Sequence, residues 1–159
     1  MSGVLGTHKV AQIGFLVRDI MAARKKWAEF LGLPEPPLVD IGDPEVTQTQ
    51  YMGKPAPNSK CVMAFFDVGP GLQIELIQPN EEHSTWRDCL DRNGEGVHHL
   101  AFNVNGTGMK MNDAIKCCED FGLKLVQRGE YGSGDGRYTY LDGQDDLKCV
   151  IELLESDKE

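Results

Sequence analysis

The sequence lacks two features that mark specialised classes of protein, a long hydrophobic run and a surplus of basic residues. No apolar stretch approaches the roughly 20 residues that a membrane-spanning helix needs, so we expect no membrane partner. Lys and Arg number 16 against 25 Asp and Glu, which gives a formal net charge of −9. Because a nucleic-acid-binding surface needs a basic footprint, this charge argues against nucleic acid as a partner.

The cysteines form no recognisable disulfide or zinc pattern. Their number, five, is odd, and Cys117 and Cys118 are neighbours on a predicted helix, where they cannot readily pair with each other. Residues 1–6 lack the basic start and the apolar block of a secretion signal. We therefore expect packed, reduced thiols and a cytoplasmic protein.

The composition is that of an ordinary globular protein, with 40% apolar and 26% charged residues in a length of 159 that is enough for one sizeable core. Its central segment is residues 94–104, where two glycines precede a run that alternates as a β-strand does. His98 falls on the apolar face of that run with Leu100 and Phe102, which indicates a core histidine. His99 falls on the opposite, polar face, which we expect to carry the chemistry.

The hydrophobic periodicity predicts the same unit, strand–helix–three strands, twice. The first copy has expected strands at 10–17, 46–51, 61–68 and 72–78 and a helix at 20–31. The second copy has expected strands at 97–104, 124–128, 137–141 and 147–154 and a helix at 110–121. Superposing residues 12–17 on 99–104 aligns Phe15 with Phe102 and Val17 with Val104, which a duplication explains.

This pattern predicts an α+β fold in a single domain spanning residues 1–159. Module one should cover about 8–79, a connector with a short helix from residue 84 or 85 to about 92 should cover 80–96, and module two should cover 97–155. One module alone would bury only one face of its sheet, so the two modules should pack together. Residues 156–159 should fray.

Two acidic residues interrupt apolar strands at equivalent places in the two modules. Glu75 and Glu152 each stand in the middle of a final strand, where burying a carboxylate is costly unless it is paired or bound to a metal. With Gln12 and His99 from the first strands, four side chains with possible ligand atoms share one face of the sheet. This set suits a divalent ion such as Zn²⁺, Ni²⁺, Co²⁺, Mn²⁺ or Fe²⁺ and needs no thiolate.

Three segments resemble the vicinal-oxygen-chelate superfamily, which includes glyoxalase I, methylmalonyl-CoA epimerase, extradiol dioxygenases and the fosfomycin- and bleomycin-resistance proteins. They are residues 75–79, 94–102 and 151–153. The resemblance implies two βαβββ modules forming a curved eight-stranded mixed sheet around a cleft. It also implies the metal ligands Gln12, Glu75, His99 and Glu152, with Glu152 as the catalytic base and Glu75 as its opposite.

The resemblance further implies a metal-dependent lyase or isomerase that transfers a proton next to a carbonyl, as a homodimer. The substrate would be a thiol adduct, as in glyoxalase I (lactoylglutathione lyase), or an acyl-CoA, as in methylmalonyl-CoA epimerase. Glutamine at position 12 resembles the eukaryotic glyoxalase I ligand set, whereas epimerases usually have histidine there. Epimerases also use a further acid near the second or third strand; none aligns around residues 56–60, and Glu45 is the nearest.

Several alternatives stay open at this point. The chain could be a non-catalytic binder that holds a small molecule on the same sheet face. Glu75 and Glu152 could be solvated acids on an open face of the sheet. Arg128, Arg137 and two tyrosines, Tyr138 and Tyr140, either contact an anionic substrate or are ordinary exposed strand residues.

Overall fold

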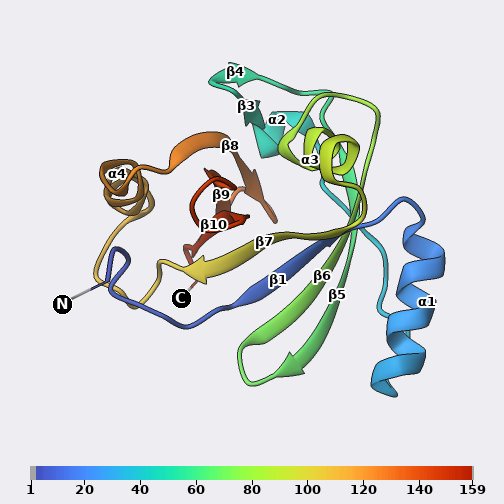
Figure 1. The fold of residues 1–159 in the computed structure, drawn as a ribbon. Helices are drawn as coiled ribbons and strands as arrows, with labels where there is room; N and C mark the ends of the chain where they lie inside the picture. Colours follow the sequence, from blue (N-terminus) through green and yellow to red (C-terminus); the bar gives the residue numbers. More distant parts are fainter. Residues whose placement is uncertain (1–2, 159) are drawn as a thin grey trace.

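The computed structural model describes residues 3–158; Met1, Ser2 and Glu159, which the predicted domain of residues 1–159 includes, lie outside the described residues. In that range one mixed sheet contains ten strands. The strands are β1 (Gln12–Leu16), β2 (Val39–Asp40), β3 (Gln50–Tyr51), β4 (Lys54–Pro55), β5 (Cys61–Gly69), β6 (Leu72–Pro79), β7 (Gly96–Asn103), β8 (Lys124–Tyr131), β9 (Gly136–Gly143) and β10 (Cys149–Ser156). The helices are α1 (Ile20–Leu31), α2 (Pro44–Thr47), α3 (Thr85–Asn93) and α4 (Met111–Phe121) (Figure 1).

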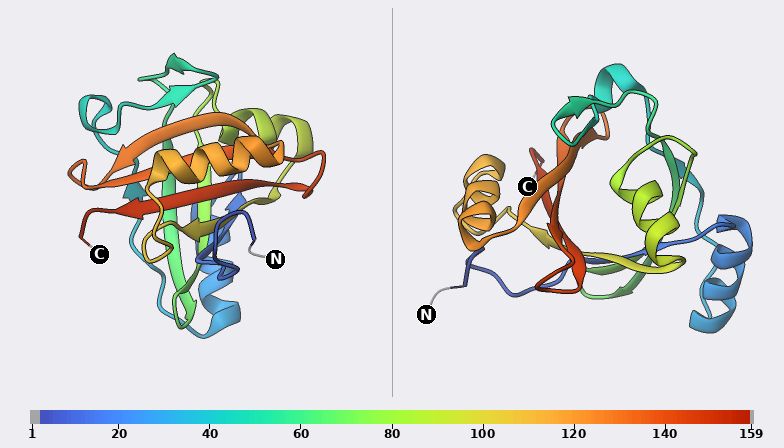
Figure 2. Two further views of the ribbon diagram at one scale, coloured as in Figure 1. Left: turned by 90° about the vertical axis from the view of Figure 1, so that its left-hand side faces the viewer. Right: turned by 45° about the horizontal axis from the view of Figure 1, so that its top comes forward.

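The sheet has a two-fold internal arrangement about the neighbouring strands β1 and β7. Its order is β2-β5-β6-β1-β7-β10-β9-β8-β3-β4, so that β1 and β7 lie side by side and run antiparallel. Each of them pairs in parallel with the last long strand of its own half, β1 with β6 and β7 with β10. The sheet curls around its concave face (Figure 2), which confirms the predicted α+β class and the curved mixed sheet.

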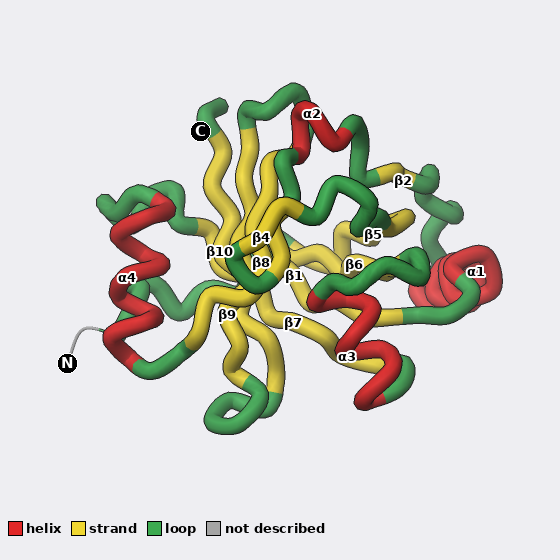
Figure 3. Tube along the Cα trace, turned by 90° about the horizontal axis from the view of Figure 1, so that it is seen from above, coloured by secondary structure: helices red, strands yellow, loops and turns green. Residues whose placement is uncertain are grey.

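Helices cover both faces of the curl. On β6, Ile74 and Leu76 pack in a core with residues of α1, while Ile77 packs with residues of α3, so these two helices lie on opposite faces. On β10, Ile151 and Leu153 pack in a core with residues of α4. Helices α1 and α4 therefore cover the convex face at opposite sides of the molecule, and α3 closes the concave side beside β7 (Figure 3).

The caps of α1 explain why its bounds agree with the sequence prediction. The Asp19 carboxylate accepts a hydrogen bond from the Ala22 backbone N–H at its start. Gly32 ends the helix in the left-handed conformation with φ of 67°, and its N–H reaches back to the last turn. Both signals are local, and the sequence carries them independently of the rest of the fold.

The strand predicted at 46–51 is wrong. Pro44 begins the short helix α2 behind the Asp43 cap, and only Gln50–Tyr51 is extended. This strand, β3, pairs with β8 of the other half and with β4, while β2 rather than this segment pairs with β5. These two-residue strands at the edges raise the sheet from the expected eight strands to ten.

The sequence predicts reduced cysteines and no membrane-spanning helix, and both features can be examined in the described residues. All five cysteines are free thiols, and Cys117 is the one that is not fully buried. Within residues 3–158, no helix has the length and apolar character that crossing a bilayer requires.

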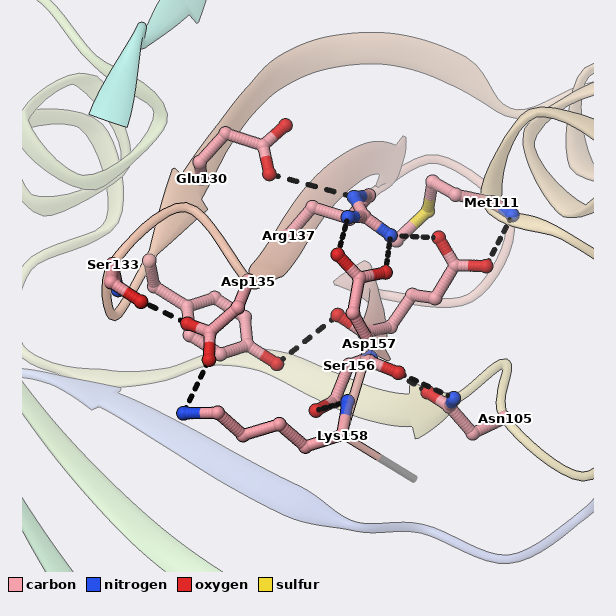
Figure 4. Close-up of polar contacts among 11 residues, drawn as sticks. Asn105, Met111, Glu130, Ser133, Asp135, Arg137, Ser156, Asp157 and Lys158 are labelled. Carbon is pink, nitrogen blue, oxygen red and sulfur yellow. Dashed lines mark hydrogen bonds and ion pairs between the residues drawn. The ribbon is translucent and has the colours of Figure 1, made fainter. Parts of the chain in front are cut away.

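The last residues are held in place, which makes the expectation of fraying wrong for Ser156, Asp157 and Lys158. The Asn105 amide donates to the Ser156 carbonyl and accepts from the Ser156 N–H, each at 2.8 Å. Asp157 pairs with the Arg137 guanidinium at 2.8 Å, and Lys158 pairs with Asp135 (Figure 4).

Glu155 supplies a cap that helix α4 otherwise lacks. Lys110 precedes the helix and makes no side-chain cap hydrogen bond. The buried Glu155 carboxylate instead accepts the Met111 N–H at 3.2 Å and pairs with Arg137 Nη1 at 2.5 Å. A carboxylate at this end of a helix satisfies an unpaired N–H and complements the helix dipole.

Replacing this carboxylate should destabilise the fold without touching the concave face. We expect Glu155→Ala to lower the free energy of unfolding by about 2 kcal/mol, because the Met111 N–H loses its acceptor. The exposed Glu119→Ala on the same helix should change it by less than about 0.5 kcal/mol. Urea denaturation followed by circular dichroism measures both, and equal effects of the two variants would contradict the capping role.

Candidate metal centre

Four neighbouring strands place the predicted site residues around the axis of the duplication. Gln12 lies on β1, Glu75 on β6, His99 on β7 and Glu152 on β10. Gly14 is in register with both Glu75 and His99. Ala101 is in register with both Gln12 and Glu152, which is the same relation in the other half.

Three of the four side chains converge on one point. His99 Nε2 lies 3.2 Å from Glu75 Oε2 and 3.0 Å from Glu152 Oε2. One ligand atom from each of the three residues lies within 4.8 Å of the others. All three are buried, with exposed fractions of 0% for His99, 5% for Glu75 and 3% for Glu152. The two glutamates are therefore not solvated acids on an open face.

The hydrogen-bonding state of these atoms tests whether an ion fits. Despite the short distances, neither the Nε2 atom of His99 nor either Oε2 atom has a hydrogen bond of acceptable geometry to any residue in the range 3–158. Buried polar atoms in proteins are nearly always satisfied, and such exceptions indicate an unseen partner. Two carboxylates also match the charge of a divalent ion, and nitrogen with oxygen donors suits the transition metals expected from the sequence. The donor set fits a metal ion.

Proton binding is strongly perturbed at this point. Burial by itself would lower the pKa of His99, but Glu152 and Glu75 outweigh it and raise the pKa to about 10. Burial raises the pKa of Glu75, and His99 opposes that rise. Without an ion, a proton on His99 is therefore the cation that the two acids share.

Gly14 leaves the space that the His99 imidazole occupies. A Cβ atom at position 14 would lie 2.1 Å from His99 Cε1, which is shorter than any real contact. The backbone of Gly14 is not in the left-handed region, so the close approach of the ring is the reason for glycine here.

The amide of Gln12 is oriented by a chain of hydrogen bonds. Gln12 Nε2 donates to Gln73 Oε1 at 2.9 Å, and Gln73 Nε2 donates to Asp67 Oδ1 at 2.8 Å. Because an ionised carboxylate can only accept, this chain fixes both amides and directs the NH₂ group of Gln12 toward Gln73. The structure places Gln12 on the wall of the same cavity as Glu75 and Glu152. Its carbonyl oxygen is the atom suited to a metal.

His98 does not lie on the apolar face that simple alternation predicts. The β1–β7 register shifts at this point, since Gly14 pairs with His99 and Phe15 pairs with Val97, which leaves His98 as the extra residue of a β-bulge. His98 is buried, with Nδ1 3.0 Å from His99 Nδ1 and its ring 5.2 Å from that of Tyr140. It is a core histidine, but it supports His99 from the side rather than packing under α4. Sequence alternation could not show this bulge.

The carboxylates open into a cavity of about 530 Å³ on the concave face. Sequence reasoning missed three further acids in its wall, Asp40, Asp67 and Glu130, and the indole of Trp86. A signal existed for Asp67, which shares the period-two face of β5 with Met63 and Phe65. Glu45, the nearest acid considered for a second base, lies on α2 and is not part of this wall.

The two arginines and two tyrosines that the sequence offers for substrate contact lie on different faces of their strands. Tyr138 and Tyr140 line the cavity, whereas Arg128 and Arg137 are not among its described lining residues. Arg137 instead pairs with Glu155 and Asp157 and lies 3.4 Å from Glu130.

A side chain at position 14 should disrupt the site. We expect Gly14→Val to displace the His99 ring and weaken binding of Zn²⁺ or Co²⁺ by more than about tenfold, as loss of one ligand would. Gly69→Val is the matched control, because a Cβ there meets nothing within 4 Å and the backbone is not left-handed. Isothermal titration calorimetry gives both affinities, and unchanged binding by Gly14→Val would contradict the placement of His99.

The raised pKa of His99 makes metal uptake dependent on pH. Below a pKa of about 10 the metal-free imidazole is protonated, so an ion must displace that proton in order to bind. We expect affinity to rise by roughly tenfold per pH unit between pH 7 and pH 9, with about one proton released per ion. Calorimetry in buffers of different ionisation enthalpy counts the protons. An affinity that does not change with pH in this range would contradict the shared proton.

Comparison with known proteins places this geometry in a wider context. The uncharacterized protein YqjC of Bacillus subtilis is 24% identical over 149 residues, covering 93% of this chain and 92% of its own. A methylmalonyl-CoA epimerase variant of Streptomyces coelicolor, in complex with 2-nitronate-propionyl-CoA, superposes with a TM-score of 0.60 at 23% identity, covering 93% and 96% of the two chains. The methylmalonyl-CoA epimerase of Mycobacterium tuberculosis gives 0.59 at 22%, covering 92% and 87%.

The two solved structures share the fold, and the sequence itself matches one family over most of its length. The match covers residues 11–140, which includes the first strand of each half and three of the four predicted ligands, Gln12, Glu75 and His99. The chain belongs to the glyoxalase/bleomycin resistance protein/dioxygenase superfamily, the vicinal-oxygen-chelate proteins.

Proposed function

We propose that this protein is a divalent-metal-dependent enzyme that transfers a proton at a carbon next to a carbonyl, as a lyase or an isomerase. The observation that carries the proposal is the convergence of three buried atoms without hydrogen-bond partners among residues 3–158, two of them on glutamates that line a cavity of about 530 Å³. Strongly perturbed titratable groups in a cleft are typical of catalytic sites.

Gln12, Glu75, His99 and Glu152 are the residues that would hold the ion. When bound, it supplies a Lewis acid that polarises the carbonyl and stabilises the negative charge that develops on its oxygen. The burial of His99 and of both glutamates keeps water away from the reacting atoms and strengthens each electrostatic interaction.

Glu152 is the group that we assign to move the proton, with Glu75 as its opposite. The two carboxylates reach the site from β10 and β6, on either side of His99. A well-placed base contributes roughly 10²- to 10⁴-fold to the rate of proton transfer. One carboxylate that removes and returns the proton gives isomerisation, whereas two acting from opposite sides give epimerisation.

The family supports the reaction class more than any particular substrate. The epimerase of Streptomyces coelicolor was solved with an acyl-CoA compound in place, and the relative in Bacillus subtilis is uncharacterised. From these proteins we carry over to this chain only the reaction class, which is proton transfer at a carbon next to a carbonyl. The cytoplasmic homodimer that the sequence predicts belongs to this proposal as well.

Deuterium exchange tests the proposal. Metal-loaded protein in D₂O should introduce deuterium next to the carbonyl of at least one member of a panel containing methylmalonyl-CoA, methylglyoxal with glutathione, and hydroxyacetone. We expect Glu152→Gln to slow this exchange by about 10²- to 10⁴-fold while part of the bound metal is retained. Proton NMR follows the exchange, and elemental analysis follows the metal.

The exposed Glu119→Gln on α4 is the matched control and should leave exchange unchanged, because it removes one negative charge far from the cavity. Ligand binding without any exchange, and with the same affinity in Glu152→Gln, would favour the alternative of a non-catalytic binder, whereas unchanged exchange in Glu152→Gln would contradict the role of Glu152. The absence of exchange with every member of the panel would exclude these specific activities.

A further inference from the structure

The charged residues that line the cavity on the concave face are all of one sign. Among its described lining residues there is no lysine, arginine or histidine. The acids are Asp40, Asp67, Glu75, Glu130 and Glu152. Two of them, Glu75 and Glu152, are more than nine-tenths buried, and each presents an oxygen without a hydrogen-bond partner in the range 3–158. The wall is therefore built to meet a ligand, and it is acidic.

The three acids outside the proposed metal centre have different partners. Asp67 accepts from the neutral amide of Gln73, and Asp40 accepts from the backbone N–H of Gly42. Glu130 lies opposite Arg137 in the β8–β9 pairing and 3.4 Å from its guanidinium, on the strand face opposite Tyr138, so its carboxylate is directed away from the cavity. No cation among the described lining residues offsets Asp40 or Asp67.

A metal ion at the proposed centre does not change the sign of the net charge of the cavity wall. A divalent cation would balance Glu75 and Glu152 and leave the negative charge of Asp40 and Asp67 in the wall. A substrate carboxylate or phosphate that enters must give up water, and proteins normally replace that water with Arg or Lys donors. This wall supplies none and adds repulsion between like charges.

The remaining wall favours a positive charge. Phe65, Trp86, Tyr131, Tyr138 and Tyr140 all line the same cavity. The negative faces of such rings attract cations, and the combination of aromatic rings with carboxylates is the usual way in which proteins bind amines.

We propose that the substrate is a small carbonyl compound that carries a protonated amine, rather than the anionic acyl-CoA or glutathione adduct that the family resemblance suggests. The inference rests on the proposed function for the position of the carbonyl. The preference for positive charge comes from the cavity wall alone. The amine faces Asp67 and the aromatic rings, while the oxygens face the ligand set.

A matched series of ligands with two neighbouring oxygens tests the preference. Dopamine, 4-ethylcatechol and 3,4-dihydroxyphenylacetate share one catechol and differ mainly in a side-chain charge of plus one, zero or minus one. Calorimetry on the zinc-loaded protein at low salt should show that affinity falls from dopamine to ethylcatechol to dihydroxyphenylacetate. Dopamine should bind at least about tenfold more tightly than dihydroxyphenylacetate. This difference in affinity should become smaller at high salt, because salt screens the charges.

Variants test whether the preference for a positively charged ligand comes from the cavity wall. Asp67→Asn should narrow the ratio of the dopamine affinity to the dihydroxyphenylacetate affinity by roughly three- to tenfold. Glu119→Gln removes the same charge on the convex side and should leave the ratio unchanged. A ratio that does not respond to Asp67→Asn, or that responds equally to the control, overturns the proposal.

The outcomes separate this inference from the proposed function. Tighter binding of the anionic ligand, or binding of none of the three, overturns the preference for positive charge whatever the metal content. If the protein takes up no zinc, the proposed function fails, and the order of the three affinities on the metal-free chain still decides the preference. If zinc binds and the order is reversed, the function stands and the substrate is anionic.

Discussion

The structure depends on two carboxylates buried at the centre of its sheet. Glu75 and Glu152 are both more than nine-tenths buried, and carboxylates in such a place need a cation between them. His99 supplies that cation as a proton in the metal-free chain, because the two acids raise its pKa to about 10. A divalent ion would replace one positive charge by two. Binding of the proposed metal would therefore be linked to folding at the same three side chains.

The duplication brings these side chains together at one site, and differences between the two halves of the chain make that site asymmetric. Equivalent registers bring Glu75 and Glu152 together from opposite directions. The first strands then contribute different groups, an amide from Gln12 and an imidazole from His99, and Gly14 leaves the space that the imidazole occupies. A bulge in β7 adds His98 behind His99. One symmetric scaffold thus holds a site with chemically distinct sides.

Elements outside the repeated unit decide what can reach the centre. Helix α3, in the connector between the halves, contributes Trp86 to the cavity, and the two-residue strand β2 contributes Asp40. Neither belongs to the strands that carry the four candidate ligands. These peripheral residues add one indole and one carboxylate to a wall whose other acidic and aromatic residues lie on the long strands.

The sequence by itself determined the features whose physical causes are local. Alternation along Leu72–Pro79 and Cys149–Ser156 placed Glu75 and Glu152 on the concave face, and the caps at Asp19 and Gly32 bounded α1, because both depend on neighbouring residues alone. Only the tertiary structure decided the bulge at His98, the pairing of β3 with β8 and the acids that meet in the cavity wall. Those features depend on contacts between segments distant in the chain, whose register no local pattern encodes.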